Sequence, residues 1–199
     1  AYDLSSINIL ISGYFTENSK IHYYRNIKER VNRVAPFLRF DNDPYISLID
    51  GKMQWILDAY TVSDRYPYSE PLYLSNNARG ILNRGNIERI ARGSVNYIRN
   101  SVKVMVDAYN GTMKFFVVDE NDPVLNTYRK IFPKLFTEKS AIPANVKAHF
   151  RYPLDLFKIQ AQIYLSYHMS NPQLFYNQED LWRFCLLYTS PSPRDSRRS

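Results

Sequence analysis

The chain has 199 residues, a formal net charge of +7, 15% aromatic residues and only 6 Gly, which is enough material for one domain with a sizeable apolar core. Its single cysteine, Cys185, excludes a disulfide scaffold and a cysteine-ligated zinc site. No apolar run reaches the roughly 18 residues that a membrane span needs, and neither an initiating Met nor a signal peptide is present, so we expect a piece of a longer protein.

The first predicted element is a short helix that starts after Asn26. Asn26 and Glu29 have the spacing of a capping box, in which each residue satisfies a backbone N–H of the other at the start of a helix. Pro36 cannot continue the helix and is expected to end it. Apolar residues recur on one face, which we expect to be buried: Ile27, Val31, Val34 and Ala35.

A first β-hairpin is predicted between residues 45 and 60, around Asp50-Gly51. Both turn residues tolerate the positive φ of a two-residue type I′ turn, and such a turn sets the register of the strands. The predicted cross-strand pairs on one face are Leu48 with Met53 and Ile46 with Trp55, while Ser47 and Gln54 meet on the other face.

A second hairpin is predicted around Asn110-Gly111, by the same reasoning. Its predicted inner pairs are Ala108 with Met113, Val106 with Phe115 and Val104 with Val117. On the outer face Asp107 is expected to meet Lys114 as an opposite-charge pair. From the two hairpins together we expect four side chains to point inward beneath a layer of helices: Met53, Trp55, Met113 and Phe115.

Three further helices complete the predicted elements. One is expected from Ile87, one after the strong Asp122-Pro123 start signal, and the longest after Pro153. The longest helix carries a broad apolar stripe that we expect to be buried: Leu156, Phe157, Ile159, Ala161, Ile163, Tyr164 and Tyr167. Asn171-Pro172 is expected to break this helix, and a last short turn is expected over 178–182. The predicted fold is α+β, with two antiparallel β-hairpins in a small sheet packed by three or four helices.

The polar residues do not form a recognisable catalytic or metal motif. The histidines His22, His149 and His168 lack metal-ligand spacing, and no GxSxG elbow is present, so we assign no catalytic, cofactor-binding or metal residue. The only acid–base candidates are four carboxylates near the hairpins: Asp58, Asp64, Asp107 and Asp119. A pair of them at one sheet end would suit glycan hydrolysis, but turn and cap roles explain the same positions, so we lean against an enzyme.

One polar segment, residues 63–69, is a candidate ligand surface. It offers an acid, a guanidinium and two phenols around a proline: Asp64, Arg65, Tyr66 and Tyr68. A loop pinned by an Asp64–Arg65 interaction and by tyrosine packing is the alternative that we favour. Aromatic and basic residues also alternate elsewhere, but they are scattered over unrelated elements, so we do not expect nucleic acid as a partner.

The last fifteen residues, 185–199, differ in composition from the rest of the chain. They are rich in Ser, Pro and Arg and show no periodicity. This segment resembles translated sequencing-adapter read-through, and we expect it to be a non-native, disordered tail that follows residues 1–184.

Seven segments between Ile7 and Trp182 resemble, in the same order, one bacterial family of multi-pass membrane proteins: NILISG, YYRNIKERVNRVAPFLRFDNDPY, DAYTVSDRYPYS, NYIRNSVKVMVDAYNGT, DPVLNTYRKIFPKLF, HFRYPLDLFKIQAQIY and YHMSNPQLFYNQEDLW. This is uncharacterised protein family number 182, in which several transmembrane helices precede a large extracytoplasmic region. The resemblance implies that residues 1–184 are a fragment of that region, at the cell membrane and on its extracytoplasmic side. It implies no known activity and no cofactor.

We therefore expect a soluble extracytoplasmic portion of an integral membrane protein, with a binding or assembly role at the cell envelope. Its expected partners are the membrane, through helices of the parent protein, and anionic lipid or wall polymer, because the chain is basic. Two alternatives remain open. An envelope hydrolase would use convergent carboxylates such as Asp58 and Asp107. A scaffold that packs on the parent's own membrane helices would expose an apolar patch.

Overall fold

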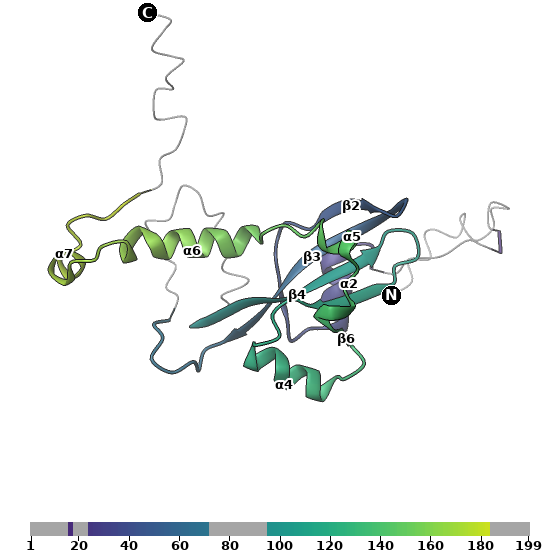
Figure 1. Cartoon of the computed structure of the whole chain (residues 1–199), viewed down its shortest axis with the longest axis horizontal. Coiled ribbons are helices and arrows are strands. Elements are labelled where there is room, and N and C mark those ends of the chain that lie inside the picture. Colours follow the sequence, from purple (N-terminus) through teal and green to yellow (C-terminus); the bar gives the residue numbers. More distant parts are fainter. Residues whose placement is uncertain (1–15, 18–23, 72–94, 184–199) are drawn as a thin grey trace, which may run out of the picture.

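The computed structural model describes residues 16–17, 24–71 and 95–183. Its strands are β1 (Arg39–Phe40), β2 (Tyr45–Ile49), β3 (Lys52–Ser63), β4 (Tyr97–Asp107), β5 (Met113–Val117) and β6 (Phe136–Thr137). Its helices are α2 (Ile27–Val34), α4 (Pro123–Ile131), the 3-10 turn η3 (Lys139–Ala141), α5 (Ala144–Lys147), α6 (Leu154–Tyr167) and α7 (Pro172–Asn177). Strands and helices share one fold, which confirms the predicted α+β class (Figure 1).

The six strands form one sheet in the order β1-β3-β4-β5-β6, and β2 also pairs with β3. β3 and β4 are the two longest strands and run antiparallel at the centre, so both predicted hairpins lie in the same sheet. β5 and β6 form the parallel pair of the sheet. A β-bulge interrupts the pairing of β3 and β4 between Ala59 and Thr61, close to the point where several polar side chains gather.

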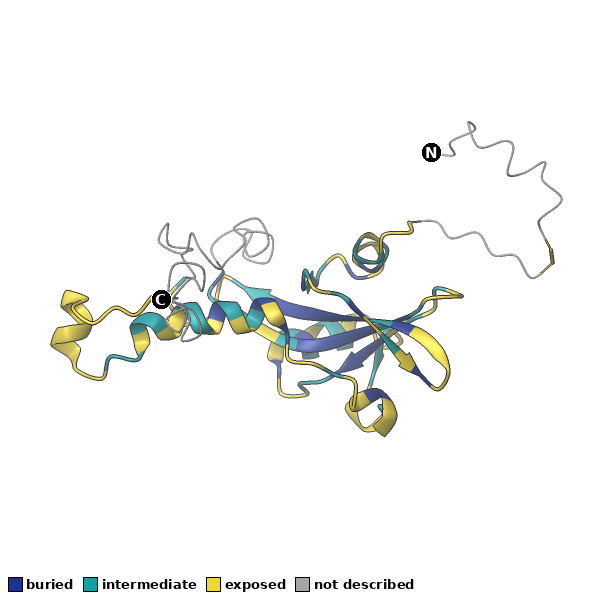
Figure 2. Ribbon diagram, turned by 90° about the horizontal axis from the view of Figure 1, so that it is seen from above, coloured by how far each residue is buried: buried dark blue, intermediate teal, exposed yellow. Residues whose placement is uncertain are grey.

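Each face of the sheet is covered by helices, and alternation along β3 divides its side chains between them. Leu57 and Ala59 belong to the larger core cluster, with Val31 of α2 and Leu125 of α4. Ile56, on the opposite face, belongs to a smaller core cluster that includes Val146 of α5. Figure 2 shows the buried residues concentrated along the centre of the sheet.

The starts of α2 and α4 confirm the predicted caps. The Asn26 side chain accepts hydrogen bonds from the backbone N–H groups of Lys28 and Glu29, and Pro36 follows the end of α2. The Asp122 side chain accepts a hydrogen bond from the N–H of Val124, with Pro123 as the first residue of α4. Both helices therefore begin where their local sequence signals predict.

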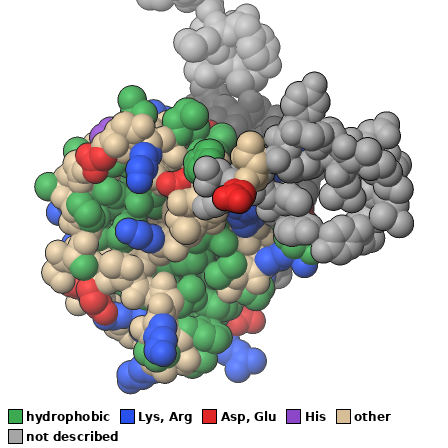
Figure 3. Space-filling model, turned by 90° about the vertical axis from the view of Figure 1, so that its right-hand side faces the viewer, with side chains coloured by type: hydrophobic (Ala, Val, Ile, Leu, Met, Phe, Trp, Pro, Cys, Tyr) green, Lys and Arg blue, Asp and Glu red, His purple; other side chains and the backbone are tan. Residues whose placement is uncertain are grey.

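The first hairpin has the predicted turn and register, but its end is not covered by helices. Asp50 and Gly51 have φ of 51° and 73°, and Leu48 lies opposite Met53. Leu48 and Met53 are nevertheless 66% and 60% exposed, and Ile46 is also exposed, so their predicted burial is wrong. Trp55 is half-buried against the larger core. The face that holds the hairpin tips carries hydrophobic side chains among lysines and arginines (Figure 3).

The second hairpin differs from the predicted register by two residues. Val106 lies opposite Met113 and Val104 opposite Phe115, because the Asp107 N–H bonds to the Thr112 carbonyl and so closes a loop of four residues, 108–111, rather than two. The Asp107 carboxylate accepts hydrogen bonds from the N–H groups of Tyr109 and Asn110, both at 2.8 Å, and these bonds stabilise the longer loop. A shift of two residues keeps each side chain on its face, so Phe115 is buried and Met113 half-buried as predicted.

The shifted register also removes the predicted Asp107–Lys114 pair. Lys114 lies opposite Met105, and Asp107 instead accepts a hydrogen bond from Gln54 of β3, at 3.2 Å. The prediction of this charge pair was wrong because it assumed a two-residue turn.

The longest helix starts after Pro153 as predicted, but most of its apolar stripe is exposed. In α6 only Asp155 and Ile159 are buried, whereas Phe157, Tyr164 and Tyr167 are exposed. Figure 1 shows α6 leading away from the sheet towards α7 at the far end of the molecule. Residues 178–180 form a turn within the predicted range 178–182, but α7, which Asn171 caps and Pro172 opens, was not predicted.

Two predicted segments lie outside the described residues: the helix from Ile87 and the tail at 185–199. Within the described ranges, no helix combines the length and hydrophobicity that crossing a bilayer requires.

Candidate functional site

The predicted ligand surface lies on the loop that follows β3. Asn96 holds this loop: its side-chain oxygen accepts a hydrogen bond from the N–H of Tyr66, and its side-chain amide donates to the carbonyls of Tyr66 and Ser69. The ring of Tyr66 stacks on Tyr97, with 5.1 Å between the ring centroids. The loop is therefore fastened to the start of β4.

The other three residues of that surface point into solvent. Asp64 and Arg65 are adjacent in sequence and form a loose, exposed ion pair of 3.9 Å. Tyr68 is fully exposed, with a positive φ of 58°. These contacts match the pinned-loop interpretation, and a ligand role for the four residues stays a prediction.

The four candidate carboxylates occupy separate structural positions. Asp58 is buried in an ion pair with Lys103 of β4, and Asp107 caps the second hairpin. Asp58 lies opposite Lys103 and Asp107 opposite Gln54, so the two acids are four positions apart along the sheet, or about 13 Å at ~3.3 Å per residue. Glycosidase carboxyl pairs are at most about 9.5 Å apart. The structure therefore does not bring Asp58 and Asp107 together.

Asp119 and Asp122 serve local structure. Asp119 accepts a hydrogen bond from Arg99 at 2.8 Å, and its other oxygen accepts one from the N–H of Asn121. Asp122 is the N-cap of α4, and its carboxylate also accepts hydrogen bonds from Thr61 (2.5 Å), Tyr97 (2.8 Å) and Ser101.

Hydrogen bonding sets the protonation of Asp122. Burial by itself would raise the pKa of Asp122, but the hydrogen bonds from Ser101, Thr61, Tyr97 and the Val124 N–H together lower it. Burial and the bond to Asp122 raise the pKa of Tyr97, so this phenol stays a donor.

A second polar network, which the sequence analysis missed, joins the β1–β2 loop to the start of α6. The Asp41 carboxylate accepts hydrogen bonds from the Tyr60 hydroxyl and from the backbone N–H of Asp155, the latter at 3.0 Å. The Asp155 carboxylate in turn accepts two hydrogen bonds from Asn42, through its backbone N–H and its side-chain amide, each at 3.0 Å. Asp41 and Asp155 are both buried.

Two lysines on helices extend the same network. Lys28 of α2 donates hydrogen bonds to the backbone and side-chain oxygens of Asn42, at 2.6 and 3.1 Å. Lys158 of α6 lies 3.6 Å from the Asp155 carboxylate. Burial raises the pKa of Tyr60, and the Asp41 carboxylate raises it further. We call this set, Lys28, Asp41, Asn42, Tyr60, Asp155 and Lys158, the α6 anchor.

No local sequence pattern predicts the α6 anchor. Asp155 lies 113 residues from Asn42, and its place in the first turn of a helix is usual for an acid. The Asp41-Asn42-Asp43 run signals only a polar turn. Because both acids are buried and hydrogen-bonded, the anchor is a structural tie between α2, the β1–β2 loop, β3 and α6.

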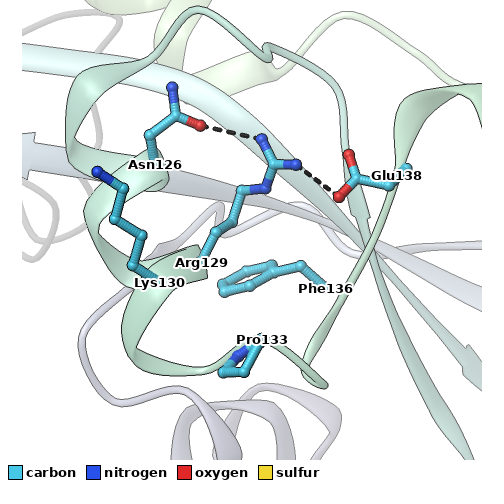
Figure 4. A pocket seen from close by; sticks show the side chains of 6 residues that line it. All are labelled: Asn126, Arg129, Lys130, Pro133, Phe136 and Glu138. Atoms are coloured by element: carbon cyan, nitrogen blue, oxygen red, sulfur yellow. Dashed lines mark hydrogen bonds and ion pairs between the residues drawn. The ribbon is translucent and has the colours of Figure 1, made fainter.

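An open pocket of about 480 Å³ lies between α4 and β6 (Figure 4). The side chains that line it are Asn126, Arg129, Lys130, Pro133, Phe136 and Glu138. Arg129 donates to the Asn126 side chain at 2.9 Å and to Glu138 at 2.5 Å. The pocket combines a fixed guanidinium with an apolar wall.

The two described histidines do not form a metal site. His149 and His168 each have their Nδ1 atom within hydrogen-bond distance of a carbonyl four residues earlier in sequence. His168 also stacks on Trp182, with 3.9 Å between the ring centroids, so this histidine is a packing residue. Among the residues described, no group of three His, Cys, Asp or Glu side chains could hold a metal ion.

Comparison with known proteins places the chain beside one family. The family described as "Uncharacterised protein family (UPF0182)" matches residues 1–193. A UPF0182 protein of Trichodesmium erythraeum is 95% identical over 184 residues, which cover 92% of this chain and 20% of the relative. UPF0182 proteins of Methanospirillum hungatei and a Sulfurovum species are each 50% identical, over 92% of this chain and 19% and 18% of those relatives.

The chain thus spans about a fifth of the length of the curated relatives that it matches. No solved structure matches it.

Proposed function

This chain belongs to the uncharacterised protein family UPF0182, and from that membership we propose that it is an assembly segment on the extracytoplasmic side of a larger integral membrane protein. In this proposal α6 and α7 dock on other parts of the same polypeptide. The expected topology of the family and the basic character of the chain support the location, and the exposed apolar surface of α6 and α7 supports the assembly role.

The observation that carries the proposal is that α6 is fastened at one end and exposed along the rest. The α6 anchor holds Asp155 in the first turn, and Ile159 in the next turn is buried. Beyond Ile159 no residue of α6 or α7 is buried. A helix that served only this sheet would turn its apolar stripe onto the sheet.

The exposed apolar side chains of α6, α7 and the residues that follow α7 make up a set that we call the aromatic arm. Its exposed members are Phe157, Ile163, Tyr164, Tyr167, Leu174, Phe175, Tyr176, Leu181 and Trp182. The arm is ordered by its own contacts: Tyr167 packs on Phe175, and Tyr164 on Trp182. Soluble monomers rarely expose an apolar region of this kind unless another surface covers it.

The occupant that we propose is the rest of the parent chain. About four fifths of each relative lies outside the matched segment, so the parent has ample polypeptide to cover the arm. Membrane helices of the parent, expected from the family resemblance, would supply an apolar surface without charge. This favours the scaffold among the functions that the sequence left open, because that function alone requires an exposed apolar patch.

Photo-crosslinking in the full-length Trichodesmium erythraeum relative tests the docking. A photoreactive phenylalanine analogue replaces the residue equivalent to Tyr176, which is 88% exposed, or to Tyr164. We expect crosslinks to distant segments of the same polypeptide, mapped by mass spectrometry. The matched control is the position of Tyr109, an exposed tyrosine in the second hairpin, from which we expect few such crosslinks. Equal yields from the three positions, or crosslinks only to lipid or to other proteins, would contradict the proposal.

Cysteine labelling tests the side of the membrane separately. A cysteine at the fully exposed position of Tyr68, in a cysteine-free full-length relative, should react with a membrane-impermeant maleimide on intact cells. Labelling only after the cells are lysed would place this segment on the cytoplasmic side and overturn the location.

A further inference from the structure

We propose that the pocket between α4 and β6 binds a small carboxylated sugar, such as a uronic acid, with Arg129 as the anchor and Glu138 as an internal carboxylate that the ligand displaces. The site is independent of the aromatic arm and extends the proposed function to a ligand. Arg129 is only 27% exposed in its side chain, and a carboxylate already occupies one edge of its guanidinium. The structure therefore shows that Arg129 binds a carboxylate in this pocket.

The guanidinium is held in place before any ligand arrives. One terminal nitrogen donates to the Asn126 side-chain oxygen at 2.9 Å, and the other donates to Glu138 at 2.5 Å. The amide of Asn126 donates to the carbonyl of Glu120 at 2.9 Å, which turns its oxygen towards Arg129. In Figure 4 the guanidinium lies between Asn126 and Glu138, above the ring of Phe136. A planar, fixed fork of this kind binds carboxylates with two parallel hydrogen bonds.

The charge around the pocket favours an external anion. Residues 126–139 contain Arg129, Lys130, Lys134 and Lys139 but only one acid, Glu138. Glu138 follows β6, and its side chain is about half exposed, so it can leave the guanidinium for water at small cost. Once it leaves, the segment is strongly positive.

The opposite wall of the pocket is apolar and rigid. The ring of Phe136 packs edge-on against the buried Phe115, at 6.4 Å between centroids, and Pro133 continues this wall after α4. Aromatic rings offer a flat surface to the apolar face of a sugar ring. A carboxylate carried on a ring therefore uses both features of the pocket, whereas a small free anion uses only the arginine.

The ordinary alternative is that Arg129 and Glu138 merely fasten α4 to β6. The two interpretations predict opposite effects of removing the carboxylate. As a fastener, Glu138→Gln would weaken the local structure and create no affinity. As a displaceable occupant, Glu138→Gln would leave Arg129 open and tighten ligand binding.

The test is an NMR titration of the complete 199-residue chain with glucuronate, with glucose and acetate as probes that lack the charge or the ring. We expect glucuronate to shift the signals of residues 126–138 and to bind at least tenfold more tightly than glucose or acetate. Glu138→Gln should tighten glucuronate binding at least threefold, and Arg129→Gln should weaken it at least tenfold. The matched control is Lys134→Gln, an exposed lysine of the same segment outside the pocket lining, which should change affinity less than twofold.

Each other outcome overturns a stated part of the proposal. If acetate binds as tightly as glucuronate, the pocket takes any small anion and the sugar is wrong. If Glu138→Gln and Arg129→Gln leave binding unchanged, or no probe binds to the folded Glu138→Gln variant, the site is wrong. Folding of each variant is read from the same spectra, through the signals of β3 and β4. None of these results depends on the membrane parent.

Discussion

At the scale of single residues, the buried ion pair between Asp58 and Lys103 has the largest expected effect on stability. Both side chains are 4% exposed, and Lys103 also donates to the carbonyl of Arg151 at 2.7 Å. Burial raises the pKa of Asp58, and the Lys103 ammonium offsets that rise only in part. Because the pKa of Asp58 is raised in the folded state, the protonated acid is the form that favours folding. Its contribution to stability is lost as the pH rises through the folded pKa.

We predict that breaking this pair is far worse than replacing it. Lys103→Met should lower the free energy of unfolding by about 3–5 kcal/mol, because it leaves the Asp58 charge buried and unpaired. The double variant Asp58→Leu with Lys103→Met should recover most of that loss. Urea unfolding at neutral pH measures both.

The control for that comparison is the half-exposed pair of Glu29 and Arg33, 3.7 Å apart on α2. Glu29→Gln should change stability by less than ~0.5 kcal/mol. A double variant that is no more stable than Lys103→Met alone would show that the pair contributes specific stability that apolar packing cannot supply.

At the scale of elements, Asp122 connects a helix start to the sheet. It caps α4 and also accepts hydrogen bonds from the hydroxyls of Thr61 on β3 and Ser101 on β4. The β-bulge at Ala59 and Thr61 lies beside this contact. One carboxylate thus fixes the position of α4 over the larger core, next to the buried Leu125.

We predict that Asp122→Ala lowers the free energy of unfolding by about 2–4 kcal/mol, from the lost cap and from hydroxyls left without an acceptor. The effect should depend on pH. Because the folded pKa of Asp122 lies below its ordinary value of 3.8, its contribution is complete above that value and is lost as the pH falls through the folded pKa. The variant should therefore lose less stability on acidification than the wild type, as measured by urea unfolding at neutral and acid pH.

Asn171→Ala is the matched control, because it removes the cap of α7 in the exposed arm, where no such network is attached. It should reduce global stability by less than ~1 kcal/mol. If the free energy of unfolding falls equally on acidification in the wild type and in the Asp122 variant, the stabilising role of ionised Asp122 is wrong.

At the scale of the whole molecule, stability and exposure are separated in space. The two central strands of the sheet, β3 and β4, hold more buried side chains than any other pair of elements, whereas α6 beyond Ile159 and all of α7 hold none (Figure 2). The tip of the first hairpin is a second exposed apolar region, with Ile46, Leu48 and Met53 on one face. Both regions extend past the helices that cover the sheet.

We predict that hydrogen exchange of the isolated chain follows this separation. Amides at the centre of β3 and β4 should exchange by global unfolding, and those of α7 should exchange at least about a hundredfold faster, because few buried contacts oppose local opening there. Exchange mass spectrometry of the 199-residue chain measures both. The first turn of α6, held by the anchor, is the internal control and should be slower than α7. Equal protection in α7 and β4 would mean that the arm is already covered within this chain.

Local sequence signals determined the features that need only neighbours in the chain. The Asn26 and Asp122 caps and the Asp50-Gly51 turn act through hydrogen bonds and φ preferences within about four residues, so their positions could be predicted. The alternation of apolar residues likewise identified the inner face of the second hairpin. The two-residue turn predicted at Asn110-Gly111 was wrong, because hydrogen bonds to the Asp107 side chain favour a longer loop.

Tertiary structure alone decided what is covered and what meets at a distance. An apolar stripe specifies a face but not the surface that covers it, which is why Met53 and Tyr164 are exposed despite their pattern. The α6 anchor joins Asp41 to Asp155, and the pocket sets Arg129 of α4 against Glu138 beyond β6. Such contacts depend on how whole elements pack, and packing is a property of the complete fold rather than of any short segment.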